Sequence, residues 1–182
     1  MSTALPATLS TPRLLLRAPR IEDAAHIFDS YAQNARVSRY LVWKPSVSLK
    51  ETTAFIEACI AARSHGVRMP YVLTLHGAED TPLGMLDVKI SQQPHSIEIG
   101  YVLAQSHWGH GYMPEAVSIF SETVLKMPAF FRVHAYCDVD NIASARTLEK
   151  SGFSREGRAE RHTLHPNISA EPRPCYLYAR CK

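Results

Sequence analysis

The stretch Ser106–Ala116, "SHWGHGYMPEA", lies where an apolar strand-like run meets a helix-like pattern. Gly109 and Gly111 allow backbone angles and close approaches that a side chain would forbid. Pro114 suits the first turn of a helix, where its missing N–H is no loss. The free amides of such a turn, together with the helix dipole, favour an anion. The stretch therefore indicates a backbone cradle for phosphate, to which His110 could add a donor, although an ordinary tight connection is the alternative.

Two common glycine-rich phosphate motifs do not describe this stretch. The Walker pattern GxxxxGK[ST] is absent, and Pro114 occupies the place of the third glycine in GxGxxG. A dinucleotide-binding fold also expects its glycine motif at the start of a βαβ unit, whereas four strand-like runs precede this one. The motif alone leaves the function open.

Working outward from this stretch, apolar periodicity predicts a mixed α/β sheet. A strand over 96–103 leads into the stretch, and a helix follows over 112–126 with one apolar face: Met113, Ala116, Val117, Phe120 and Val124. Further strands are expected at 13–19, 71–77, 83–90, 131–137, 153–164 and 175–181, with turns at 76–80 and 91–95. Further helices are expected at 21–32, from Ser48 to Gly66, and at 140–152. The predicted order is β-α-α-β-β-β-α-β-α-β-β.

Two helices carry local signals beyond periodicity. "SLKE" (48–51) is a capping-box pattern, and a stripe follows it: Thr52, Phe55, Ile56, Cys59 and Ile60. Asp140 or Asn141 can cap the later helix, and Gly152 can end it.

Composition limits the class of protein. The 182 residues predict a single domain over 10–182 with a short N-terminal extension, 1–9. An excess of three positive charges is too small to indicate nucleic acid, though it suits an anionic cofactor. No CxxC pair, signal-peptide pattern or membrane-length apolar run occurs, so reduced thiols and a soluble cytoplasmic protein are expected.

Three stretches together resemble the GNAT superfamily of acyl-CoA N-acetyltransferases, and within it the RimJ/RimL-like branch that acetylates ribosomal-protein N-termini. They are "TPRLLLRAPRIEDA" (11–24), "IEIGYVLAQSHWGHGYMPEA" (97–116) and "DNIASARTLEKSGFSREG" (140–157). The resemblance covers roughly residues 10 to 182 and implies the GNAT fold, whose element order is the one predicted above. It also implies acetyl-CoA as co-substrate, and no metal.

The resemblance assigns the pyrophosphate loop of the family, Q/R-x-x-G-x-G/A, to six consecutive residues: Trp108, Gly109, His110, Gly111, Tyr112 and Met113. Two positions depart from the pattern. Trp108 replaces Gln or Arg, and Met113 replaces Gly or Ala and could crowd the loop. A main-chain cradle does not depend on either side chain.

Acetyl transfer requires a deprotonated amine, and Glu98 is the candidate base. In the strand 96–103, Ile97 and Ile99 point to one face and Glu98 to the other. An acid in a central strand is costly without a partner or a function, so a structural Glu paired with an Arg or an amide is the alternative. The resemblance places the amide that binds the acetyl carbonyl at or near Leu103.

The resemblance also implies that Asn141 and Ser144 face the pantetheine and sulfur of the coenzyme. Ser144 is then the candidate acid for the departing thiolate, directly or through water. The alternative is that Asn141 is only a helix cap and Ser144 only a first-turn residue. Two histidine pairs at i, i+3 (His107 with His110, His162 with His165) lack a clear third metal ligand, and no GxSxG motif supports a serine nucleophile.

Two irregular segments, 34–48 and 165–175, are expected to border the acceptor, with Tyr40, Trp43 and Tyr101 as candidate walls and core packing as the alternative. The expected acceptor is the N-terminal α-amine of a protein. A small-molecule amine, such as an antibiotic, a polyamine or an amino acid, is the second hypothesis, and a non-catalytic acyl-CoA-binding module the third. No nucleic acid or membrane partner is expected, and the protein is expected to be a monomer or a homodimer.

Overall fold

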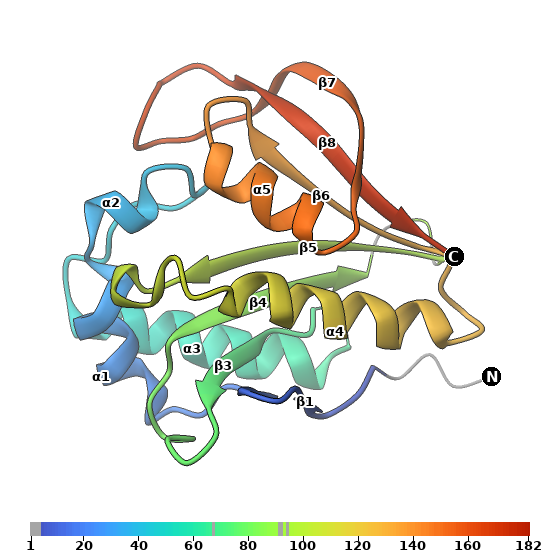
Figure 1. The fold of residues 1–182 in the computed structure, drawn as a ribbon. Helices are drawn as coiled ribbons and strands as arrows, with labels where there is room; N and C mark the ends of the chain where they lie inside the picture. Colours follow the sequence, from blue (N-terminus) through green and yellow to red (C-terminus); the bar gives the residue numbers. More distant parts are fainter. Residues whose placement is uncertain (1–4, 67, 91–92, 94) are drawn as a thin grey trace.

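A computed structural model of the chain describes residues 5–66, 68–90, 93 and 95–182. Eight strands form one mixed sheet in the order β1-β2-β3-β4-β5-β6-β8-β7 (Figure 1). Their bounds are Leu9–Ser10 (β1), Leu14–Arg17 (β2), Tyr71–Leu75 (β3), Gly84–Ile90 (β4), Ser96–Leu103 (β5), Arg132–Asp138 (β6), Ser154–Thr163 (β7) and Arg173–Cys181 (β8). The helices are Asp23–Ile27 (α1), Ala35–Ser38 (α2), Leu49–Ser64 (α3), Tyr112–Lys126 (α4) and Ile142–Lys150 (α5).

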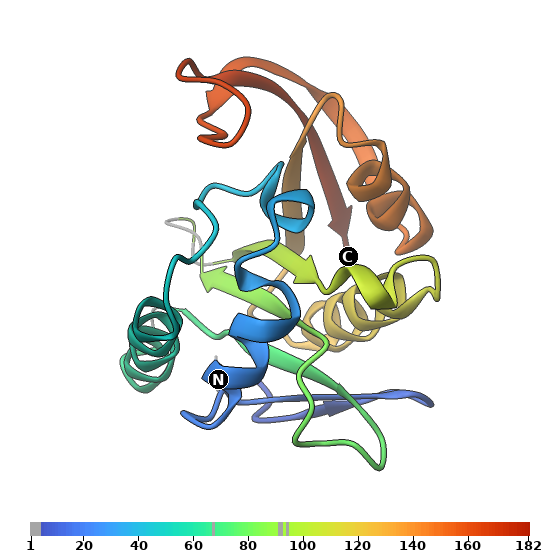
Figure 2. The ribbon, with the colours of Figure 1, turned by 90° about the vertical axis from the view of Figure 1, so that its left-hand side faces the viewer.

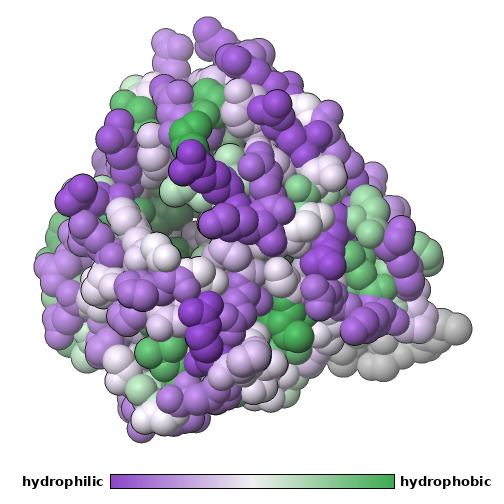
Figure 3. Space-filling view, viewed as in Figure 1, coloured by the Kyte–Doolittle hydropathy of each residue, from purple (hydrophilic) through white to green (hydrophobic). Residues whose placement is uncertain are grey.

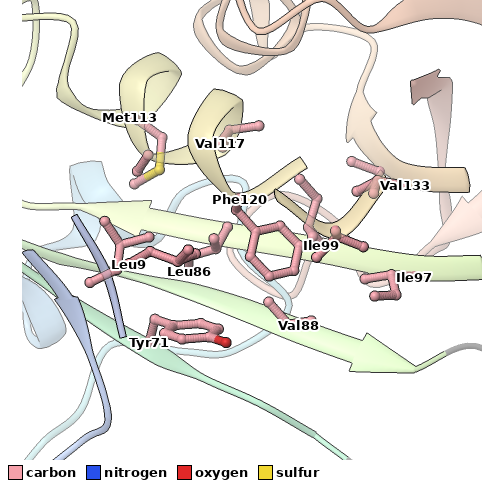
Figure 4. Packing of buried hydrophobic residues seen from close by; sticks show 14 of the residues in the cluster. Leu9, Tyr71, Leu86, Val88, Ile97, Ile99, Met113, Val117, Phe120 and Val133 are labelled. Carbon is pink, nitrogen blue, oxygen red and sulfur yellow. The ribbon is translucent and has the colours of Figure 1, made fainter. Parts of the chain in front are cut away.

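Helices cover both faces of the sheet. Figure 2 shows α1 and α3 on one face and α4 and α5 on the other. The larger core lies under α4, where Met113, Val117 and Phe120 pack against strand residues such as Ile97 and Ile99 (Figure 4). Phe120 is fully buried, and burial of such a side chain contributes roughly 1.5–3 kcal/mol. A smaller core under α1 and α3 includes Ile56 and Cys59.

The feature that positions the site is the divergence of β5 and β6. These parallel strands pair only over Ser96–Glu98 and Arg132–His134, although β5 continues to Leu103 and β6 to Asp138. Beyond Glu98 and His134 the two strands diverge, as Figure 1 shows. We call the region between their unpaired ends, residues 99–103 and 135–138, the wedge. The wedge opens at the end of β5 that leads into residues 104–111.

The structure confirms the mixed α/β fold class and most predicted elements. The strand 96–103 and the helix 112–126 have the predicted bounds. Ser48 caps α3 by accepting a hydrogen bond from the Glu51 amide, as the capping-box pattern predicted. The predicted turn at 91–95 lies partly outside the described residues.

The predicted order lacks two short elements, β1 and the helix α2 in the segment expected to be irregular, and three further details differ from the sequence-based predictions. The predicted helix 21–32 is α1 followed by one π-helical turn, Phe28–Ala32. Phe55 and Ile60, predicted in the buried stripe of α3, are 40% and 39% exposed, because Thr52, Ile56 and Cys59 alone face the core at helical spacing. Leu5 and Leu9, assigned to an extension, are buried in the main core, so residues 5–10 pack as part of the domain.

None of the described helices is long and apolar enough to cross a membrane. All four cysteines are free thiols, with Cys59, Cys137 and Cys175 buried and Cys181 exposed.

Candidate active site

The loop between β5 and α4 presents a row of free backbone amides. Gly109 and Gly111 have φ angles of 82° and 77°, in the left-handed region that glycine adopts readily. Among the hydrogen bonds found for the described residues, none has the amide of residues 109–113 as donor. Such a row at the start of a 15-residue helix can hold phosphate oxygens.

The two side chains that depart from the loop pattern have specific positions. The indole Nε1 of Trp108 donates a hydrogen bond to the carbonyl of Leu103 at 2.8 Å, which fixes the loop against the end of β5. Met113 is 4% exposed and packs in the core below α4. Its side chain therefore points away from the amides, and the predicted crowding of the loop does not occur.

Arg13, the residue before β2, braces this loop from a distant part of the chain. Its Nη1 donates to the carbonyl of His110 at 2.9 Å, and its Nη2 lies 2.6 Å from a carboxylate oxygen of Glu115. The guanidinium also lies 4.7 Å from the ring centre of Tyr112, on which His110 stacks. Thr11 donates a further hydrogen bond to Glu115. No local sequence pattern predicts this cluster, because its members are about a hundred positions apart.

The charge of Glu115 is secured by the same contacts. Burial by itself raises the pKa of Glu115, but hydrogen bonds from Thr11 and Arg13 outweigh it and lower the pKa below its usual value. Glu115 and Arg13 therefore remain an ion pair around neutral pH, and their positions hold the amide row in place.

Replacing Arg13 by methionine is expected to weaken coenzyme binding about fivefold. The change loosens the loop and removes no side chain from the hydrophobic core. A half-exposed charged hydrogen bond contributes on the order of 1 kcal/mol, which corresponds to that factor. Isothermal titration with coenzyme A measures it. Arg20→Met is the matched control, since Arg20 is similarly exposed and pairs with Asp80 instead. Equal affinity of both variants and the wild type would show that the brace is dispensable.

The wedge exposes backbone groups of β5. Ala104 donates to the carbonyl of Leu83, and hydrogen-bonded pairs alternate along an antiparallel ladder. The N–H and C=O groups of Tyr101 and Leu103 therefore turn away from β4 and toward the wedge, where β6 no longer pairs with them. The Leu103 amide can thus meet a carbonyl oxygen inside the wedge.

Tyr101 and Ser144 meet across the wedge. The Tyr101 hydroxyl lies 2.8 Å from the Ser144 Oγ and 3.2 Å from the Ser144 carbonyl. Asn141 caps α5, its side-chain oxygen accepting from the Ser144 amide. Tyr101 packs against the core under α4, whereas its neighbour Val102 packs against the core under α1 and α3. Tyr101 therefore lies on the opposite face of β5 from Glu98, beside Ser144 rather than beside the acceptor segments where it was expected.

Glu98 faces a separate hollow beside the point where the wedge begins. Its carboxylate accepts a hydrogen bond from Lys89 at 3.0 Å, and its side chain is 28% exposed. Glu98 is therefore paired, though with a lysine on the neighbouring strand rather than with the arginine or amide considered above. The hollow, about 230 Å³, is also lined by His134, Tyr136 and His162.

The proton state of His134 suits a role near this carboxylate. Burial lowers the pKa of His134 below its usual value, although the charge of Glu98 acts in the opposite direction. The imidazole is therefore mostly neutral around pH 7 and able to accept a proton. The structure thus brings a carboxylate and a neutral imidazole together at the last paired position of β5 and β6.

The two irregular segments meet over the open end of the wedge. The Nδ2 of Asn167 donates to the carbonyls of Ser38 and Trp43, both at 2.7 Å, and so ties the segments together. The Tyr40 hydroxyl donates to the carbonyl of Asp140, just before α5. Figure 3 shows the surface hollowed here, between α2, α5 and the end of β5.

The second segment is anchored by a buried carboxylate. Asp138 is fully buried, and Arg173 binds it through two hydrogen bonds at 2.6 and 3.1 Å. Burial by itself raises the pKa of Asp138. The hydrogen bonds from Arg173 and the Asp140 amide outweigh this effect, so the pKa lies below its usual value. The carboxylate stays charged, and the rim formed by 165–175 is fixed to the end of β6.

Other candidate groups do not form sites. Within the part of the chain that the structure describes, no group of three or more His, Cys, Asp or Glu side chains could hold a metal ion. A larger hollow of about 500 Å³, lined by Arg20, Glu22, Asp23 and Asp80, lies beside α1 and the β3–β4 turn. It contains none of the loop, wedge or rim residues.

Comparison with known proteins identifies the family of this architecture. The family model for an acetyltransferase (GNAT) domain matches residues 13–154. An uncharacterized N-acetyltransferase of Bacillus subtilis, YoaA, is 31% identical over 156 residues, which covers 82% of this chain and 84% of YoaA.

Solved structures share the whole fold. An acetyltransferase of the GNAT family from Bacillus anthracis superposes with a TM-score of 0.82 at 25% identity, covering 96% of this chain and 98% of that one. RimL, a ribosomal L7/L12 α-N-protein acetyltransferase solved with coenzyme A, has a TM-score of 0.82 at 22% identity and covers 97% of each chain.

Proposed function

The chain belongs to the GNAT acetyltransferase family and is an acetyl-CoA-dependent N-acetyltransferase, and we propose that its acceptor is the N-terminal α-amine of a protein. The observation that carries the proposal is the rim: two segments joined by Asn167 and anchored through Arg173 lie over the open end of the wedge. A fixed, open rim suits an extended chain end, whose entropy loss on binding is reduced by a preformed surface.

The size of the hollow beside Glu98 supports the same acceptor. Its volume of about 230 Å³ is below the ~300–1,000 Å³ usual for small-molecule pockets. It can admit an amine and one short side chain, while the rest of a peptide extends over the rim. An α-amine with a reference pKa of ~8 is about one-tenth neutral at pH 7, against under about a thousandth for lysine.

The roles of the site residues follow from this proposal. The amides of residues 109–113, braced by Arg13, bind the pyrophosphate of acetyl-CoA. The Leu103 amide donates to the acetyl oxygen as negative charge develops there. Glu98 takes the proton of the attacking amine, directly or through water, and Ser144 donates to the departing sulfur. Tyr40 and Trp43 line the acceptor side.

The protein-acceptor proposal also includes membership of the RimJ/RimL-like branch, which the shared fold of RimL supports. The free thiols suit a reducing compartment that holds acetyl-CoA, and we propose the cytoplasm.

Peptides with a free N-terminus and an internal lysine are expected to be acetylated at the N-terminal amine, with lysine a poor site. Incubation with acetyl-CoA followed by fragmentation mass spectrometry locates the modified nitrogen. The same peptides with a blocked N-terminus are the matched control and should remain unmodified. A parallel panel of small amines tests the second hypothesis. Modification of one small amine with every peptide inert would overturn the protein acceptor and leave the acetyltransferase activity intact.

A further inference from the structure

Tyr101 is the group that the established activity leaves without a role. It is the third residue beyond the last paired position of β5, and its side chain reaches across the wedge to α5. There its hydroxyl lies 2.8 Å from the Ser144 Oγ, closer than the 3.2 Å to the Ser144 carbonyl. Beyond the point where β5 and β6 separate, β5 is thus linked to α5 by a pair of hydroxyl groups, one of which belongs to the proposed acid.

The environment keeps Tyr101 protonated. Burial raises the pKa of Tyr101 well above its usual value, and the hydrogen bond with Ser144 lowers it by less. Burial also raises the pKa of the neighbouring Cys137, on β6, to about 11, so this thiol is neutral as well. The hydroxyl of Tyr178 donates to Glu149 at 3.0 Å. Tyr101 is therefore a phenol, and not a phenolate, throughout the neutral range.

A phenol has one proton to donate. If that proton goes to the nearer acceptor, the Ser144 Oγ, the hydroxyl of Ser144 must direct its own proton elsewhere. The cap made by Asn141 fixes the first turn of α5, so the backbone of Ser144 cannot rotate away. The Cys137 thiol also forms a hydrogen bond with the Ser144 side chain. When Tyr101 and Cys137 both donate to the Ser144 Oγ, they occupy its two lone pairs, and the Ser144 proton points into the wedge.

We propose that Tyr101 is a positioning residue that fixes the Ser144 hydroxyl with its proton aimed at the coenzyme sulfur. This inference rests on the proposed role of Ser144. In the reaction the acceptor nitrogen forms a bond to the thioester carbonyl carbon, and the carbon–sulfur bond breaks with its electron pair going to sulfur. Ser144 donates a hydrogen bond to that thiolate while Tyr101 donates to Ser144. The proton lost by nitrogen leaves through the base, and the thiolate takes a proton from water on release.

The direct test is the pKa of the coenzyme A thiol when bound, measured from the thiolate absorbance difference between complex and free protein. A hydrogen bond to the thiolate lowers that pKa. Tyr101→Phe and Ser144→Ala should each raise the bound thiol pKa relative to the wild type. The double variant should match Ser144→Ala alone, because Tyr101 acts only through Ser144. Tyr71→Phe, which removes a buried hydroxyl bonded to Pro6, should leave the thiol unchanged.

Turnover gives the second readout. Tyr101→Phe should lower kcat about tenfold, the factor expected when the transition state loses one hydrogen bond. The KM for acetyl-CoA should be nearly unchanged. A wild-type thiol pKa in folded Tyr101→Phe would overturn the inference, since Tyr101 would then only pack. A wild-type thiol pKa and kcat in every variant would show that Ser144 does not bond to the sulfur either. Failure of the wild type to bind coenzyme A would instead refute the proposed function.

Discussion

Replacing Gly111 by valine is expected to abolish the thermal stabilisation that acetyl-CoA gives the protein. A ligand that binds only the folded state at 100 times its Kd adds about 2.7 kcal/mol, or roughly 5–10 °C for a domain of this size. Gly111 has a φ of 77° at the cap of α4, and a Cβ there would lie 3.5 Å from the Arg13 guanidinium. A branched side chain would both strain the backbone and stand beside the free amides.

The strain alone must be separated from the loss of binding. Gly77 has a φ of 80° in the turn between β3 and β4, and a Cβ there would meet nothing within 4 Å. Gly77→Val should therefore lower the free energy of unfolding by a similar amount, about 1–2 kcal/mol, and keep the full melting-temperature shift with acetyl-CoA. A folded Gly111→Val variant that retains the melting-temperature shift with acetyl-CoA would show that this loop does not bind the phosphates.

The sequence predicts the elements around this loop well because their patterns are local. The strand 96–103 alternates apolar residues that face the core under α4 with Glu98 on the other face, and the helix 112–126 carries a regular apolar face. Both patterns are set by neighbours within a few residues. The two-residue strand β1 is too short for any period, and a π-helical segment of five residues is too short for its wider turn to be told from that of an α-helix.

The candidate site is harder to predict because its contacts join distant residues. Arg13 and Glu115 meet only because β2 and α4 pack together, and neither residue carries a local signal for the other. Residue alternation does assign Tyr101 to the face opposite Glu98, and that signal could have separated Tyr101 from the acceptor walls. The partner of Glu98 follows from the register of β4 and β5, in which Lys89 lies opposite. The sequence does not specify that register without the turn between the strands.

Glu98→Gln is expected to lower kcat roughly 100-fold or more while leaving the affinity for acetyl-CoA unchanged. A positioned base contributes on the order of 10²- to 10⁴-fold, and the amide keeps the shape of the carboxylate without its basicity. The acidic limb of the pH profile should change in the variant, because the amide cannot accept a proton. Rates over pH 6 to 9 with a peptide acceptor measure both effects. Glu122→Gln is the control, because Glu122 lies on α4 and pairs with Arg180 of β8.

Lys89 turns this prediction into a test of mechanism. Burial by itself lowers the pKa of Lys89, but the hydrogen bond and charge of Glu98 raise it above its usual value, so the lysine is a cation throughout the assay range. Its ammonium group donates to the Glu98 carboxylate and holds it in place. Lys89→Met should therefore lower kcat about fivefold, the factor that corresponds to the loss of a hydrogen bond of about 1 kcal/mol, and leave a rate well above that of Glu98→Gln. If Glu98→Gln kept the wild-type rate at every pH, the base would be another group. The neutral imidazole of His134, which lines the same hollow, would then be the residue to replace next.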